Sequence, residues 1–276
     1  MAQAIRYRSA MRSPHVHTAP AGGRLARGFR FVLRVPMLLW HALVHLPLVM
    51  IGIMLPSDRV AVGGETLRSR LVRWWQGGLM RVFGMRMRLI GEPLPGAAMF
   101  VANHVSWMDI SALHSQRMMG FVAKQEIDGW PVVGRMARRG ETIFHQRGSQ
   151  ESLGGVLDAM IVRLGEGRAV GVFPEGRTRD GNEVGPFHAR IFMAAGEAGV
   201  PVQPVALRYG AGGEGQRAVA FQGRENFLQN FLRLLGEPPR VVDVVFLEPV
   251  MPGGAEGRAA IAKIARERIV EALRVS

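Results

Sequence analysis

Hydrophobic and polar positions divide the chain into an apolar N-terminal part and an alternating C-terminal part. Residues 35–55 form an uncharged run of 21 residues. At about 1.5 Å per residue, a helix of this length just crosses a hydrocarbon core about 30 Å thick. Pro47 predicts a break or kink near the middle of the run. Residues 66–83 follow with apolar side chains at helical spacing and arginines between them, which is typical of an interfacial membrane helix or an ordinary surface helix.

After residue 84, short β-rich runs alternate with helical patterns. The expected strands are 85–90, 97–102, 121–123, 142–144, 169–173, 202–207 and 241–247. The expected helices are 110–116, 150–164, 189–198, 225–234 and 256–273. Such alternation predicts an α/β domain in which helices flank a mixed, largely parallel sheet. Ligands of these folds bind beyond the carboxyl ends of the strands.

The charge of the chain limits the classes of partner that it can bind. There are 35 basic and 22 acidic side chains, a net charge of +13, and all but two of the basic residues are arginine. This balance predicts an anionic partner, which is a membrane surface, a nucleic acid or a phosphorylated small molecule. The absence of cysteine excludes a disulfide framework, a thiol nucleophile and a cysteine zinc site.

The distribution of arginine predicts how the apolar run meets a membrane. Residues 1–34 contain seven arginines and no acid, and residues 59–88 hold seven more against Glu65. A single span carries its arginine excess on one side, so arginine on both flanks favours a hairpin that enters one leaflet and returns. A buried core helix is the alternative. We therefore expect a basic, mobile tail over 1–34, a membrane-associated helical segment over 35–83 that contains the hairpin of residues 35–55, and an α/β domain over 84–276.

The first candidate for chemistry follows the strand expected at 97–102. Here Asn103 and His104 lead to Asp109 five residues later, about one helical turn on. A carboxylate that accepts the Nδ1 proton of a histidine holds the ring as a general base. The other interpretation is a structural histidine with Asp109 as a helix cap. No further acidic or histidine cluster has ligand spacing, and we expect no metal site.

Two further segments leave strands at the same edge. Glycine and arginine surround Glu175 after the strand 169–173, which suits a tight turn that binds a phosphate and a polyol. Arg147 follows the strand 142–144. A solvated turn with a Glu–Arg pair and a surface arginine are the simpler interpretations of the two segments.

The ordered set of motifs resembles the glycerolipid (phospholipid/glycerol) acyltransferase family. Its N-H-x-S-x-x-D block, its F-P-E-G block and its V-P-V-x-P-V strand are met at 103–109, 173–176 and 200–205. The resemblance implies acyl transfer from acyl-CoA or acyl-carrier protein as co-substrate, with no other cofactor. It implies His104 and Asp109 as catalytic residues, and the following substrate-binding residues: Asn103, Ser106, Arg147, Glu175, Gly176, Arg177 and Arg179.

Departures from the family pattern bear on the acceptor. The family usually has Thr-Arg-Ser after F-P-E-G, whereas residues 177–179 are Arg-Thr-Arg, and Glu141 takes a usual glycine position. The resemblance implies lysophosphatidate as acceptor, giving phosphatidate in phospholipid synthesis. Residues 180–182 and 186–187 are similar to a subgroup that acylates lyso-ornithine lipid, which is the alternative.

The expected partners are a lysolipid acceptor, an acyl-thioester donor and anionic membrane lipid at the cytoplasmic face of the cell membrane. A basic membrane- or nucleic-acid-binding protein without catalysis is a distant alternative. We expect no nucleic-acid partner, because the N-terminal arginines adjoin an apolar run and no RNA-binding aromatic motif is present. A lipid hydrolase would need a G-x-S-x-G elbow, which the sequence lacks.

Overall fold

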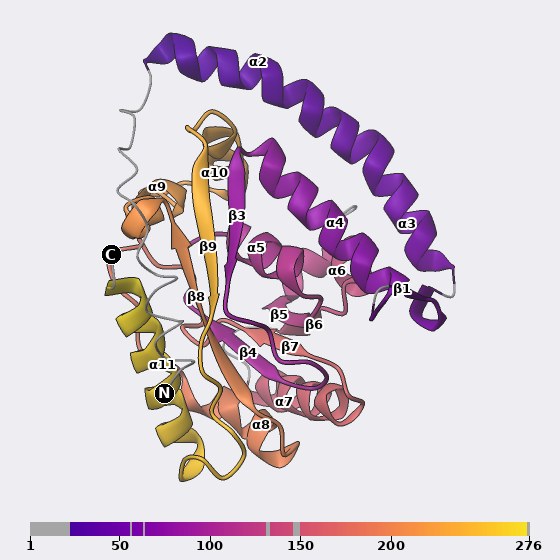
Figure 1. The fold of residues 1–276 in the computed structure, drawn as a ribbon, viewed down its shortest axis with the longest axis vertical. Helices are drawn as coiled ribbons and strands as arrows, with labels where there is room; N and C mark the ends of the chain where they lie inside the picture. The colour runs from indigo at the N-terminus through magenta and orange to yellow at the C-terminus, as the bar shows by residue number, and fades with distance from the viewer. Residues whose placement is uncertain (1–22, 56, 63, 131–132, 146–149, 275–276) are drawn as a thin grey trace.

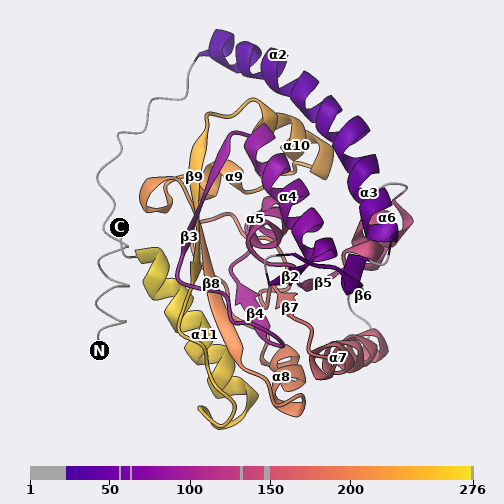
Figure 2. The same cartoon turned by 45° about the vertical axis from the view of Figure 1, so that its right-hand side comes forward.

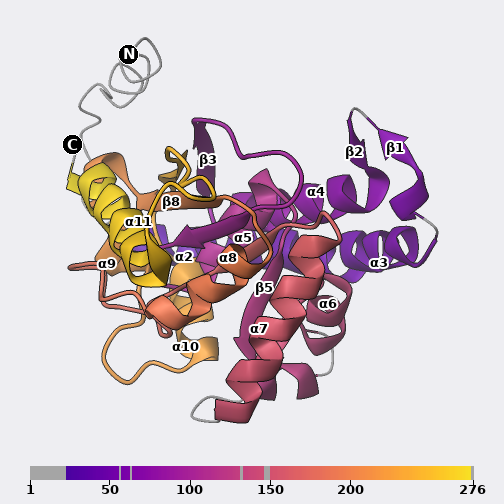
Figure 3. The same ribbon diagram turned by 90° about the horizontal axis from the view of Figure 1, so that it is seen from below.

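The α/β domain is built on one seven-stranded sheet with helices on both faces (Figures 1 and 3). The computed structural model describes residues 23–55, 57–62, 64–130, 133–145 and 150–274. The strands, in chain order, are β3 (Met85–Ile90), β4 (Met99–Ala102), β5 (Gly120–Lys124), β6 (Ile143–His145), β7 (Val170–Val172), β8 (Val202–Tyr209) and β9 (Arg240–Phe246). All seven predicted strands are confirmed, each end within two residues of its expected position.

The strand order brings the motif-bearing strands together. Across the sheet the order is β3-β9-β8-β4-β7-β5-β6. The β8–β9 pair is antiparallel and the other pairs are parallel. Because β4 lies between β8 and β7 and runs parallel to both, the carboxyl ends of these three strands meet at one edge.

Alternate residues of β4 enter two different cores. Phe100 and Ala102 pack into a cluster with α4 (Leu67–Val82), α5 (Met108–Gln116) and α10 (Phe227–Leu235). Met99 and Val101 pack into a cluster with α7 (Gln150–Gly165), α8 (Met193–Glu197) and α11 (Gly257–Arg274). This alternation is the period of two of a strand buried on both faces. Two short helices were not predicted, α6 (Val133–Arg139) and α9 (Gln216–Val219).

The N-terminal part forms a helical hairpin, but its turn does not lie within residues 35–55 as expected, because residues 24–54 form one continuous helical stretch (Figures 1 and 2). Its first arm is one continuous helical stretch, made of α2 (Arg24–Trp40), the π-helical η1 (His41–His45) and α3 (Leu46–Met54). After the short strands β1 (Ala61–Val62) and β2 (Glu65–Thr66), α4 returns against it as the second arm. The predicted break at Pro47 is wrong: this proline lies in the first turn of α3, directly after a wider π-turn that accommodates its ring.

The boundary of the basic tail also differs from the expectation. Helix α2 begins at Arg24, so the tail does not extend to residue 34, and residues 1–22 lie outside the described residues. Arg34 is buried and donates to the carbonyls of Leu235 and Glu237 at 2.9 and 2.7 Å, while Arg30 donates to that of Gly236 at 2.8 Å. These carbonyls end α10, where the helix dipole favours a cation.

The outer face of the first arm is apolar and uncovered. Exposed side chains along it include Leu25, Phe29, Leu33, Leu43 and Ile51. Within the described residues, Arg24–Met54 is the one helix long and apolar enough to cross a membrane, by length and composition alone, and 17% of its most apolar window is buried. An exposed apolar face of this size marks a contact surface rather than an ordinary solvated helix.

We predict that Arg34→Ala loosens the hairpin from the α/β domain. The substitution removes two hydrogen bonds from a buried cation and leaves two helix-end carbonyls without their donor. Hydrogen bonds to charged groups contribute roughly 1.5–3 kcal/mol each, so we expect a loss of about 3–6 kcal/mol in the free energy of unfolding by urea in detergent micelles. Arg24→Ala is the matched control because Arg24 is exposed. Equal stability of the two variants would contradict this role.

Candidate active site

His104 and Asp109 meet directly at the carboxyl end of β4. The Nδ1 atom of His104 lies 2.8 Å from Oδ2 of Asp109. The chain turns sharply after β4, and Asp109 occupies the first turn of α5, so the carboxylate points back at the strand end. Since an ionised carboxylate only accepts, Nδ1 carries the proton in this pair and Nε2 keeps its lone pair.

Four donors surround the Asp109 carboxylate, which is fully buried. Oδ2 also accepts from the backbone N–H groups of Val105 and Ser106, at 2.7 and 2.9 Å. Oδ1 accepts from the hydroxyl of Tyr209 at 2.6 Å. Asp109 therefore holds the turn before α5 and orients the His104 ring at the same time. It is not the cap of α5, as the alternative interpretation expected, because the N-cap is Trp107 and Asp109 lies inside the first turn. That His104 acts as a general base stays a prediction.

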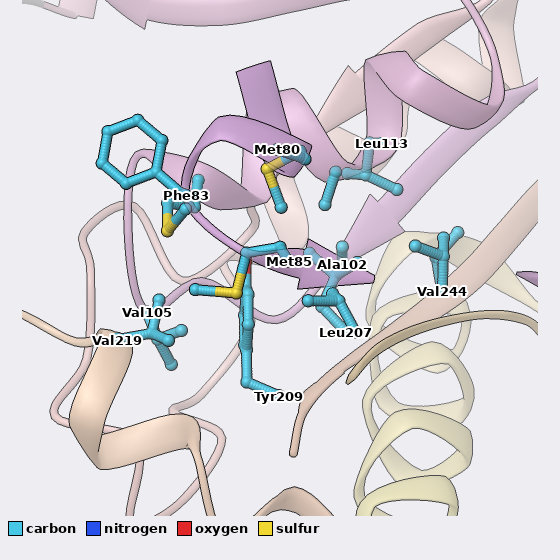
Figure 4. Packing of buried hydrophobic residues seen from close by; sticks show 14 of the residues in the cluster. Met80, Phe83, Met85, Ala102, Val105, Leu113, Leu207, Tyr209, Val219 and Val244 are labelled. Carbon is cyan, nitrogen blue, oxygen red and sulfur yellow. The ribbon is translucent and has the colours of Figure 1, made fainter. Parts of the chain in front are cut away.

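Tyr209 is the residue that the sequence motifs missed. It ends β8, is fully buried, and lies within the core cluster beside Leu207 (Figure 4). Burial and the negative charge of Asp109 raise the pKa of its hydroxyl well above the ordinary value, so it remains a proton donor. The available signal was a polar aromatic residue at the carboxyl end of an otherwise apolar strand.

An aromatic stack fixes the plane of the His104 ring. Phe173 lies parallel to it, with ring centroids 4.0 Å apart at 14°. Phe121 stacks in turn on Phe173 at 5.5 Å and 13°. The first residue of the F-P-E-G motif thus acts on the histidine from the neighbouring strand β7.

Glu175 holds the backbone of the histidine rather than its side chain. Its Oε1 accepts from the N–H of His104 at 2.8 Å, and its Oε2 accepts from the N–H of Gly185 at 2.8 Å. Arg179 adds a hydrogen bond from Nε to Oε2 at 3.2 Å. Burial raises the pKa of Glu175, while these hydrogen bonds and Arg179 act in the opposite direction. Gly176 forms the tight turn at φ 70°, as its residue type predicts.

The other predicted binding residues have different surroundings. Asn103 is buried and bonds to both the N–H and the carbonyl of Leu207, joining β4 to β8. Ser106 is fully buried, and its Oγ accepts from the N–H of Met108 at 3.4 Å. Arg177 is exposed, and Arg147 lies outside the described residues. That these side chains contact the acceptor stays a prediction.

A pocket of about 320 Å³ adjoins the site on the far side of the Glu175 carboxylate. Its walls include Asn103 and Arg179 together with Glu183, Arg266 and Arg274, so charges of both signs surround it. Arg266 donates to the carbonyls of Val184 and Gly185, which fixes this wall to α11.

Glu141, at the family's usual glycine position, has a left-handed backbone with φ 64°, alone among the described non-glycine residues. Its carboxylate lies 3.5–3.9 Å from Arg68, Arg163 and Arg168. For a residue with a Cβ this backbone conformation costs about 1–2 kcal/mol. The three arginines attract the Glu141 carboxylate and so help to hold the residue in it. The backbone geometry of the family is thus kept without the glycine.

Comparison with known proteins agrees with this geometry. The Acyltransferase family model matches residues 86–208. Lyso-ornithine lipid O-acyltransferase of Pseudomonas aeruginosa is 36% identical over 207 residues, covering 75% of this chain and 80% of the relative. The chain belongs to the acyltransferase family. The 1-acyl-sn-glycerol-3-phosphate acyltransferase of Neisseria meningitidis is 41% identical over 123 residues, covering 44% of this chain and 48% of the relative.

The fold of the acyltransferase is also that of a solved structure. The crystal structure of the 1-acyl-sn-glycerophosphate (LPA) acyltransferase PlsC from Thermotoga maritima matches with a TM-score of 0.69 at 22% identity. The match covers 90% of this chain and 96% of that chain. Family membership makes the protein a lipid-biosynthetic enzyme with a lysolipid acceptor, which removes the alternative of a basic binding protein without catalysis.

We predict that Tyr209→Phe slows turnover without weakening acceptor binding. The variant keeps the ring in the core and removes one hydrogen bond to a buried carboxylate, worth roughly 1.5–3 kcal/mol. If this hydrogen bond keeps Asp109, and through it His104, in position in the transition state, kcat falls about 10- to 100-fold while the acceptor KM stays within about twofold. Steady-state kinetics beside a thermal unfolding scan separate this from misfolding. A normal kcat in a folded variant would show that the Tyr209 contact is only structural.

Proposed function

We propose that the acyltransferase moves an acyl group directly from a thioester donor, acyl-CoA or acyl-carrier protein, to the free hydroxyl of a lysolipid. His104 Nε2 takes the hydroxyl proton as the oxygen attacks the thioester carbonyl carbon. The C–S bond then breaks and the proton passes to the thiolate, giving an ester and a free thiol. General-base catalysis of this kind contributes about 10²–10⁴-fold in rate.

The observation that supports this mechanism best is the pairing of His104 with a fully held Asp109. A proton-bearing Nδ1 leaves Nε2 as the base. The nearest hydroxyl of the motif, Ser106, is buried and engaged with the turn, so it is not placed as a nucleophile. The backbone N–H groups of residues 104–106 are likewise occupied, and the oxyanion must find its donors elsewhere.

We propose lyso-ornithine lipid as the acceptor. The sequence motifs alone favoured lysophosphatidate, but three relatives named for lyso-ornithine lipid match 73–83% of this chain, against 44% for the two Neisseria relatives named for 1-acyl-sn-glycerol-3-phosphate. An ornithine headgroup carries both an amine and a carboxylate. The pocket beside Glu175 offers Arg179 and Glu183 as partners of opposite charge.

Lysophosphatidate remains the second candidate acceptor. Over the 123 residues that contain the site, the relatives named for 1-acyl-sn-glycerol-3-phosphate have the higher identity, 41%. Arg177 is exposed and makes no hydrogen bond or ion pair with the described residues, so it is available to a phosphate.

The exposed face of α2 and α3 supports attachment to one leaflet, at the cytoplasmic side of the cell membrane. Both substrates carry long chains that partition into lipid, so an enzyme that rests in the leaflet meets them without extracting them into water. The two arms return to the same side of the structure (Figure 2), as a hairpin in one leaflet requires. The exposed arginines then face anionic lipid.

We predict that His104→Ala reduces acyl transfer by at least 100-fold while the protein stays folded. The variant removes the base but none of the bonds that Asp109 receives from Val105, Ser106 and Tyr209. His188→Ala is the matched control, because its imidazole is exposed, and it should keep at least half of the activity. Transfer at the wild-type rate by His104→Ala would refute the assignment.

We predict that the enzyme prefers lyso-ornithine lipid in a side-by-side assay. Purified protein in micelles would receive one acyl-CoA and either lyso-ornithine lipid or lysophosphatidate, with kcat/KM measured for each. We expect at least tenfold preference for lyso-ornithine lipid. The reverse preference would establish lysophosphatidate as the acceptor, and transfer to neither would contradict both assignments.

A further inference from the structure

A second cleft lies within the hairpin, away from His104. One hollow of about 470 Å³ opens between the first arm and α4, and another of about 610 Å³ opens between α4 and the edge strand β3. Trp74 and Arg81 line both hollows, so the two adjoin along α4 and are together called the α4 cleft. Neither hollow includes His104, Asp109 or Glu175.

One half of the α4 cleft is apolar and aromatic. Met37 and Trp40 form its wall on the first arm and are 50% and 60% exposed, and Trp74 faces them from α4 at 47%. The indole of Trp40 donates to Nε2 of His45 at 3.1 Å, and the His45 ring lies 4.9 Å from that of Trp74. This half continues the exposed apolar face of α2.

The other half of the α4 cleft is cationic. Its walls carry four arginines against one carboxylate, Glu65, which is already bound by Arg73 at 2.8 Å. Arg70, Arg81 and Arg86 are exposed, and in the described part of the chain they make no hydrogen bond or ion pair. Three uncompensated guanidinium groups therefore share one concave surface, where each raises the free energy of the others.

We propose that the α4 cleft binds one anionic phospholipid, with its phosphate on Arg70, Arg81 and Arg86 and its acyl chain along Met37 and Trp40. Guanidinium groups bind phosphate oxygens in a bidentate geometry, and tryptophan favours the boundary between headgroups and chains. Arg70 and Arg81 lie on α4, which packs against the first arm, and the axes of packed helices are about 8–10 Å apart. An interfacial helix is buried about 5–10 Å into the headgroup boundary. A second helix packed behind it therefore lies near the depth of the lipid phosphates.

Because the α4 cleft has an apolar half beside a cationic half, it favours a lipid over a soluble phosphate ester. A water-soluble anion would use the arginines and leave the aromatic half exposed, whereas an anionic lipid satisfies both. The bound lipid would lower the net positive charge of the cleft and fix the rotation of the hairpin in the leaflet. This inference rests on the proposed membrane placement of α2 and α3, and it is independent of acyl transfer.

The test compares two variants that lose the same charge. The cleft variant carries Arg70→Gln, Arg81→Gln and Arg86→Gln. The control carries Arg258→Gln, Lys263→Gln and Arg268→Gln on α11, which lies on the other side of the sheet from the hairpin (Figure 2). Full-length protein in neutral detergent micelles is titrated with phosphatidylglycerol carrying brominated chains, and quenching of tryptophan fluorescence is followed without acyl donor.

We expect saturable binding of one lipid to the wild type and the control, and at least tenfold weaker binding to the cleft variant. The single variant Arg81→Gln should weaken binding about three- to fivefold, which keeps the test decisive if the triple variant unfolds. Phosphatidylcholine should bind weakly to all forms. Equal affinity of the two triple variants would overturn the proposal, as would coenzyme A competing as well as the lipid. Flotation with neutral vesicles separately tests the membrane placement.

Discussion

The candidate site depends on one buried carboxylate. A charged group removed from water must have its lone pairs satisfied, or folding becomes costly. Asp109 meets this requirement with two backbone N–H groups, the Tyr209 hydroxyl and Nδ1 of His104. The turn after β4, the start of α5 and the end of β8 are therefore joined at a single point. The tautomer of His104 follows from the same constraint, so the bonds that stabilise the fold also prepare the base.

A second carboxylate completes the positioning of the histidine. Glu175 binds the main chain of His104, while Phe173 stacks on the ring and Asp109 binds its edge. The sheet order makes this possible, because β7 and β8 flank β4 and all three are parallel. Residues after β7 thus hold the main chain and the ring face of His104, while Asp109 in α5 holds the ring nitrogen and is itself bound by Tyr209 at the end of β8. A base held at several points has little conformational freedom to lose on reaching the transition state.

The features that depend on short stretches of sequence were predicted correctly. The seven strands follow from short apolar runs bounded by turn residues, and the contact between His104 and Asp109 follows from their spacing across one turn. Tyr209 was missed because it lies 100 residues from Asp109 and is placed only by the pairing of β8 with β4. Pro47 was overweighted because the π-turn before it arises from packing that no residue pattern specifies. Glu175 was expected to face the substrate, since its sequence does not reveal the backbone amides of His104 and Gly185 that surround it.

The arginine excess divides into groups with separate tasks. Arg30 and Arg34 attach the hairpin to the end of α10, Arg179 supports Glu175, and the α4 cleft gathers three more whose charges are not matched by the protein. Of these three groups, the last has no acidic partner among the described residues and calls for an external anion. Attachment through α10 also places the exposed apolar arm on the same framework as the site, because α10 packs in the core cluster that contains Tyr209.

The most direct test of the account is the protonation state of the His104 ring. Full-length protein labelled with ¹⁵N-histidine, in micelles at a pH where the ring is neutral, would be examined by NMR, and the His104→Gln spectrum would assign its signals. We predict a protonated Nδ1 and an unprotonated Nε2, as the bond to Asp109 requires. A His104 ring with its proton on Nε2 would show that Asp109 does not hold the base and would contradict the proposed mechanism.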